Sequence, residues 1–124
     1  LEQSFSSATT VMSATITPKF NTSKILIQNS TTSCGTRDSS TFYELYINRN
    51  STRIHTIGTY IGLSVSTDVC FPTMCYMDSP GTTSAVTYNM IAHRKQGSAN
   101  CYFNLDNGGS ISHNAVLMLM EVSA

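Results

Sequence analysis

Three histidines are the side chains best suited to catalysis in this sequence, and they stand far apart at His55, His93 and His113. A catalytic histidine needs a nucleophile within hydrogen-bond reach and a third group that orients the ring. No nucleophile elbow, paired metal ligands or glycine-rich phosphate loop accompanies any of the three. We therefore expect each to be a hydrogen-bonded side chain at a surface or interface, and we predict that the protein is not an enzyme.

The aspartates are equally scattered. Asp38, Asp68, Asp78 and Asp106 each lie beside small polar residues or turn formers, where a carboxylate usually accepts hydrogen bonds from the backbone. A glycosidase would need two carboxylates in one cleft. Residues 106–109 could offer oxygen ligands to calcium, but they lack the spaced carboxylates of a dedicated calcium loop. We expect no cofactor and no metal site.

Four cysteines, Cys34, Cys70, Cys75 and Cys101, permit three disulfide connectivities if all of them pair. The spacing of Cys70 and Cys75 does not match the Cys-x-x-Cys pairs of structural zinc sites. Free thiols and one or two disulfides both remain open, because the sequence does not identify the redox compartment.

The composition of the 124 residues indicates a single domain over 1–124 with no electrostatic partner. Charged residues make up 11% of the chain, and seven acidic residues balance seven Lys and Arg, so neither nucleic acid nor an anionic membrane is an expected partner. The longest apolar run, residues 116–120, is far shorter than the roughly 20 residues of a membrane-spanning helix. Because the first residue is Leu1, we expect a processed chain or the C-terminal part of a longer one.

The pattern along the chain is that of β-structure. Alternating or continuous short apolar segments, separated by turn formers, predict strands at residues 11–17, 24–28, 41–49, 52–57, 59–61, 63–69, 84–93, 100–105 and 115–124. Turn signals about every 8 to 12 residues are typical of a sandwich or barrel. We predict an all-β, jelly-roll-like β-sandwich. An immunoglobulin-like sandwich is the alternative, although the chain has no Trp and lacks the Cys-Trp-Cys spacing of that fold.

The last predicted strand is apolar on both faces. One face carries Val116, Met118, Met120 and Val122, and the other carries Leu117 and Leu119. Such a strand needs cover on both faces, which a neighbouring subunit can supply. On another predicted strand, Phe42, Glu44, Tyr46 and Asn48 form a mixed face that is a candidate subunit boundary. The predicted oligomer interface therefore consists of Phe42, Tyr46, Met118 and Met120.

Three stretches of the sequence together resemble a known group of proteins: residues 13–27 (SATITPKFNTSKILI), residues 77–88 (MDSPGTTSAVTY) and residues 117–124 (LMLMEVSA). Their order is similar to that in C-terminal domains of fibre and virion structural proteins of tailed phages, particularly marine phages. The resemblance extends from about residue 12 to the end of the chain. Each motif is only a strand and a turn, so the order and spacing carry the match.

The resemblance implies a β-sandwich similar to the trimeric jelly rolls of tumour-necrosis-factor type, and a location in the virion. The expected function is that of a fibre or spike tip, a knob that attaches to a host receptor. The expected partners are two further copies in a homotrimer, other virion proteins, and a glycan or protein of the host surface. The alternative is a capsid decoration or tail-assembly module without receptor binding.

Recognition in a tip domain is expected on loops that a rigid scaffold holds in place. Two segments, residues 29–40 and 73–83, are long for hairpin connections and rich in small polar residues, and long loops are often functional. The predicted binding residues in these loops are Arg37, Asp38, Tyr76 and Asp78.

Overall fold

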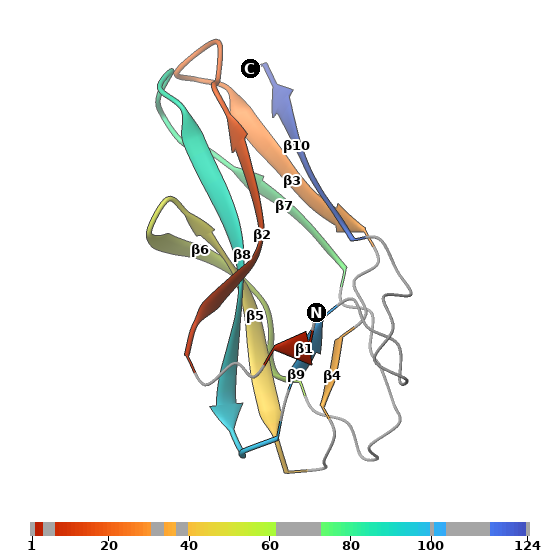
Figure 1. The fold of residues 1–124 in the computed structure, drawn as a ribbon. Helices are drawn as coiled ribbons and strands as arrows, with labels where there is room; N and C mark the ends of the chain where they lie inside the picture. The colour runs from red at the N-terminus through yellow and green to blue at the C-terminus, as the bar shows by residue number, and fades with distance from the viewer. Residues whose placement is uncertain are drawn as a thin grey trace.

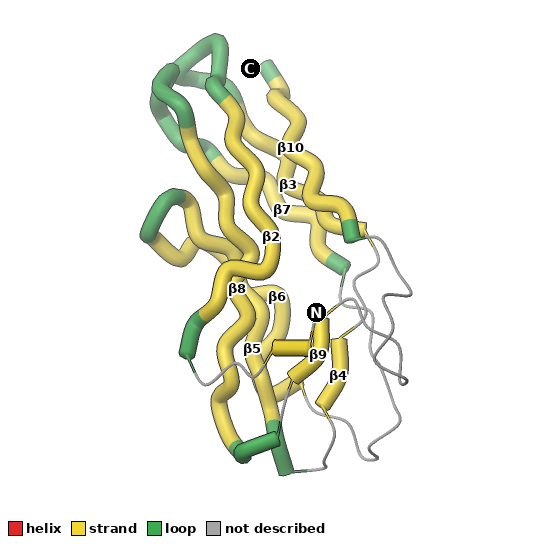
Figure 2. Tube along the Cα trace, in the orientation of Figure 1, coloured by secondary structure: helices red, strands yellow, loops and turns green. Residues whose placement is uncertain are grey.

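The computed structural model of the chain describes residues 2–3, 7–30, 34–36, 40–61, 73–99, 101–103 and 115–123. Within these residues every regular element is a strand, and Figure 2 shows no helix. The strands are β1 (Glu2–Gln3), β2 (Thr9–Ile16), β3 (Lys24–Ser30), β4 (Cys34–Thr36), β5 (Phe42–Arg49), β6 (Thr52–Ile61), β7 (Met74–Asp78), β8 (Val86–Gln96), β9 (Cys101–Phe103) and β10 (Val116–Val122). The prediction of an all-β protein is confirmed.

The described strands form two antiparallel sheets that face each other as a sandwich (Figure 1). One sheet has the order β2-β8-β5-β6 and the other has the order β10-β3-β7. A small third sheet, in the order β1-β9-β4, lies at the end of the sandwich away from the C-terminus. The chain crosses from the four-stranded to the three-stranded sheet between β2 and β3 and again between β6 and β7, and it returns to the four-stranded sheet between β7 and β8.

Apolar side chains from both sheets fill the space between the layers. The buried members are Tyr43, Leu45 and Ile47 of β5, Val86, Tyr88, Met90 and Ala92 of β8, Ile25 and Ile27 of β3, Met74 of β7 and Phe103 of β9. Burying one Ile or Leu side chain stabilises the fold by about 1.5–3 kcal/mol. A slip of one residue would turn this row of side chains outward, so the core also sets the register of the strands.

The terminal strand β10 alternates as its sequence predicts. Leu117 and Leu119 pack against the core, while Val116 and Met118 on the opposite face are exposed. The strand pairs antiparallel with β3 along its whole length, from Val116 opposite Ser30 to Val122 opposite Lys24. The sandwich therefore covers only one of the two apolar faces of β10.

A tight hairpin joins β5 to β6, between the strands predicted at residues 41–49 and 52–57. Arg49 pairs with Thr52, so Asn50 and Ser51 form a two-residue connection. Asn50 has a φ of 52°, a left-handed conformation that Asn tolerates better than most residues. Its backbone N–H donates to the Thr87 carbonyl at 2.7 Å, and its side-chain Oδ1 accepts from the Thr87 N–H at 3.1 Å. The turn is thereby fastened to β8.

The prediction of two long recognition loops is wrong where the structure describes them. The segment at residues 73–83 contains β7, which pairs antiparallel with β3 from Met74 opposite Asn29 to Asp78 opposite Ile25. The segment at residues 29–40 begins inside β3 and contains β4. β7 and β4 form because they pair with segments that are distant in the sequence, and local composition does not reveal such partners. The predicted strand at residues 63–69 lies outside the described residues.

Candidate functional site

The predicted binding residues Tyr76 and Asp78 lie on β7, with their side chains turned toward the interior. Tyr76 is half-buried, and its ring stacks on the His55 ring with 4.5 Å between centroids and 20° between planes. Asp78 is buried. The other two predicted binding residues, Arg37 and Asp38, lie outside the described residues. The binding role of these four residues stays a prediction, and the two that are described have contacts within their own chain.

Asp78 is the centre of a polar network that joins the two sheets. Its Oδ2 accepts a 2.7 Å hydrogen bond from the Tyr88 hydroxyl on β8. The Arg49 Nη1 at the end of β5 lies 3.1 Å from both carboxylate oxygens and also donates to the Ser79 carbonyl at 3.3 Å. A buried carboxylate needs such partners, because leaving it unpaired costs several kcal/mol. The network holds β7 against the four-stranded sheet.

A second charged group, which we call the Glu44 cluster, lies on the outer face of the four-stranded sheet and consists of Glu44, Arg53, His93 and Lys95. Arg53 donates to both carboxylate oxygens of Glu44, from Nη2 to Oε1 at 3.0 Å and from Nη1 to Oε2 at 3.4 Å. The His93 Nδ1 lies 3.2 Å from Oε1, and the Lys95 Nζ lies 3.6 Å from Oε2. Three nitrogen-bearing side chains thus surround one carboxylate.

The electrostatics of the Glu44 cluster keep its carboxylate ionised. Burial raises the pKa of Glu44, but hydrogen bonds from Arg53 and His93, together with the charges of Arg53 and Lys95, outweigh that effect and hold the pKa below its ordinary value. The hydrogen bond with Glu44 in turn raises the pKa of Arg53. The Arg53 guanidinium also lies over the Tyr46 ring, with its Cζ 3.5 Å from the centroid, at a distance where cation–π attraction is effective.

The outer face of the three-stranded sheet carries a group of apolar side chains, which are interspersed with the exposed polar residues Lys24, Gln28 and Ser30 of β3. We define this apolar sheet face as Leu26, Met77, Val116, Met118, Met120 and Val122. Strand pairing places Met120 beside Leu26 and Leu26 beside Met77. Except for half-buried Leu26, these side chains are between 38% and 53% exposed. Cys75 of β7 is an exposed free thiol and pairs with Gln28 of β3.

The predicted interface residues separate onto the two opposite outer faces of the sandwich. Met118 and Met120 belong to the apolar sheet face, and both are exposed. Phe42 and Tyr46 lie on β5 of the other sheet, where Tyr46 is buried beneath Arg53 and Phe42 is half-buried. The prediction that these four residues meet a neighbouring subunit remains untested.

The histidines within the described part of the chain have structural contacts. His55 stacks on Tyr76, and His93 faces Glu44. His113 lies outside the described residues. No group of three or more His, Cys, Asp or Glu side chains that could hold a metal ion occurs in the described ranges. Within the same ranges, no helix has the length and apolar character needed to cross a membrane.

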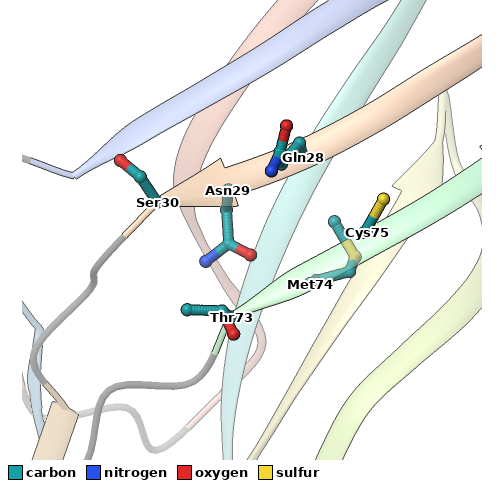
Figure 3. A pocket seen from close by; sticks show the side chains of 6 residues that line it. All are labelled: Gln28, Asn29, Ser30, Thr73, Met74 and Cys75. Atoms are coloured by element: carbon teal, nitrogen blue, oxygen red, sulfur yellow. The ribbon is translucent and has the colours of Figure 1, made fainter.

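A hollow of about 390 Å³ lies where β3 ends and β7 begins, lined by Gln28, Asn29, Ser30, Thr73, Met74 and Cys75. Figure 3 shows Gln28 and Cys75 pointing to one side of the sheet and Asn29 pointing to the other. None of the six lining side chains bears a formal charge, apart from the ionisable thiol of Cys75. The hollow therefore offers hydrogen bonding but no charged group to anchor a ligand.

Sequence reasoning missed the Glu44 cluster. The sequence shows only that Glu44 is a charged residue in the middle of a predicted strand, on the face opposite Tyr43 and Leu45. That position was the one sign of a charged site on this face. It does not reveal that Arg53 and Lys95 converge on that carboxylate, because their positions depend on the registers of β6 and β8 against β5.

Comparison with known proteins identified no relative of this chain. No protein-family model matches the chain, and no curated protein matches it significantly.

Proposed function

We propose that this chain is a virion structural subunit, the tip domain of a tail fibre or spike, which forms a homotrimer and attaches the particle to a glycan or protein of the host surface. The observation that carries the proposal is the apolar sheet face. A group of exposed apolar side chains bordered by polar residues is typical of an interaction site. We assign this face to contact with further copies of the same chain, and we place the protein in the virion with other virion proteins as partners.

The sandwich architecture supports the finer proposal of a jelly roll of tumour-necrosis-factor type. The chain crosses from one sheet to the other more than once, as it does in jelly rolls, and does not complete one sheet before it starts the other. A threefold axis beside β10 would bring three copies of Met118 and Met120 together. The outer face of the four-stranded sheet would then be directed away from that axis.

The proposed role does not include catalysis. In the described part of the chain, the side chains of His55, Asp78 and His93 each have a contact within the fold, and Glu44 is held by three neighbours. A general acid or base must reach a substrate proton. The arrangement favours stability and recognition over turnover.

The alternative is a capsid decoration or tail-assembly module that does not bind a receptor. The inward orientation of Tyr76 and Asp78 favours this alternative, because it removes two of the four predicted binding residues from the surface. The location of the domain on intact particles separates the two roles. Labelled antibodies against the domain should mark the ends of fibres or spikes, and label distributed over the capsid would favour decoration.

Assembly through the apolar sheet face is tested by light scattering of the purified chain at micromolar concentration. The wild type should have the mass of a trimer, and Met118→Asp or Met120→Asp should give a folded monomer. Because both side chains are exposed in the single subunit, the charge does not enter the core of that subunit. Thr83→Asp, at an exposed turn position, is the control and should leave the trimer intact. A monomeric wild type, or trimers that tolerate both substitutions, would contradict the proposal.

A further inference from the structure

The Glu44 cluster holds more hydrogen-bond donors than its carboxylate needs. Arg53 alone contacts both oxygens of Glu44, which is the arrangement that satisfies a carboxylate in many proteins. His93 and Lys95 are additional. The Glu44 side chain is 3% exposed, whereas Arg53, His93 and Lys95 are 44%, 33% and 35% exposed. The single negative charge is therefore covered, and the donors around it face solvent.

No other described carboxylate neutralises this surface. Asp78 is buried between the two sheets, where Tyr88 and the half-buried Arg49 contact it. Glu121 accepts a 2.7 Å hydrogen bond from the Lys19 backbone N–H beside β10. Within the part of the chain whose side chains are described, the outer face of the four-stranded sheet consequently has an excess of hydrogen-bond donors and positive charge, which favours an anionic ligand.

An aromatic side chain lies in the same patch. Tyr46 supports the Arg53 guanidinium from below, which restricts the motion of that group. A fixed guanidinium beside a lysine suits a sugar acid, because the carboxylate of the ligand can meet both cations.

We infer that the Glu44 cluster binds a carboxylate-bearing sugar, as found in an acidic polysaccharide. Lys95 supplies the exposed donor to the ligand carboxylate, whereas the Nδ1 of His93 donates to Glu44. Arg53 adds its remaining N–H groups, and Glu44 acts as the positioning residue that holds all three in place. The choice of a saccharide, rather than another anion, rests on the proposed role in host attachment. The site lies on the two central strands β5 and β8, which give it a rigid base.

Calorimetric titration of the full chain with oligogalacturonate tests this inference, with a maltooligosaccharide of equal length as the neutral probe. Oligogalacturonate should bind, added salt should weaken the binding, and the neutral probe should not bind. Lys95→Gln should weaken binding about tenfold, as expected for loss of a charge-assisted contact. Lys19→Gln is the matched control. It removes the same charge from an exposed position between β2 and β3 and should leave the affinity unchanged.

Three results would overturn the inference. The first is an absence of binding, and the second is an equal loss in Lys95→Gln and Lys19→Gln, which would mean general attraction to positive charge. The third is a Lys95→Gln variant that no longer has the mass of a trimer but keeps its saccharide affinity. That result would mean that the cluster binds a carboxylate of the neighbouring subunit. None of these results alters the particle location or the effect of Met118→Asp, so failure of this inference is distinguishable from failure of the proposed function.

Discussion

The hydroxyl of Tyr88 donates a 2.7 Å hydrogen bond to the Oδ2 of Asp78 inside the sandwich. The two residues lie on different sheets, Tyr88 on β8 and Asp78 on the edge strand β7. Tyr88 is fully buried and Asp78 nearly so. This bond therefore links the layers through a buried polar contact, and it explains why a charged residue can end a strand that packs on the core.

We expect Tyr88→Phe to lower the free energy of unfolding by about 2 kcal/mol, the usual contribution of a hydrogen bond to a charged group. Phe keeps the ring in the core and removes only the donor to Asp78. Urea denaturation measures the change. Tyr76→Phe is the matched control, because its ring stays stacked on His55, and it should change stability by less than about 0.5 kcal/mol. Equal effects of the two substitutions would contradict a specific role for Tyr88.

The same hydrogen bond predicts a loss of stability at alkaline pH. Burial first, and then the hydrogen bond and charge of Asp78, raise the pKa of Tyr88 above its ordinary value of 10.0. Above pH 10.0 the unfolded chain loses the phenolic proton while the folded protein retains it, so rising pH favours unfolding. Below that value the contribution is fully present.

Comparison of the wild type with Tyr88→Phe isolates this effect from the other groups that titrate in alkali. The difference in unfolding free energy between the two proteins should be constant near neutral pH and should shrink above about pH 10, by at most about 1.4 kcal/mol per pH unit. Denaturant titrations across this range measure it. A difference that stays constant or grows with pH would mean that the Tyr88 hydroxyl is not protected in the folded state.

Gly97 is expected to be far less tolerant of alanine than Gly81, although both have positive φ values of 83° and 65°. A Cβ at Gly97 would lie 2.5 Å from the Cα of buried Thr41, so the turn after β8 would have to move away from the start of β5. Nothing lies within 4 Å of a Cβ at Gly81. Thermal or urea unfolding should show a cost of about 1 kcal/mol for Gly81→Ala and at least about 3 kcal/mol for Gly97→Ala. Similar costs would mean that backbone strain alone, and not the close approach to Thr41, makes Gly97 necessary.

The amino-acid sequence by itself determined the β class, the alternation within several strands and one turn. Tyr43, Leu45 and Ile47 face the core because side chains alternate along any strand. The same rule separates Leu117 and Leu119 from Met118 and Met120. Asn50 marks the hairpin because it tolerates a positive φ. These features depend on local geometry, which neighbouring residues specify without help from the rest of the chain.

Only the tertiary structure decided what those side chains meet. β7 is a strand because β3, about 50 residues earlier in the chain, supplies its hydrogen-bond partners. Tyr76 and Asp78 turn inward because His55, Arg49 and Tyr88 are there to receive them. Glu44 is buried on an outer face because the registers of β6 and β8 bring Arg53, His93 and Lys95 over it. Each of these contacts joins segments that are distant in sequence, so its energy depends on the packing of the whole sandwich.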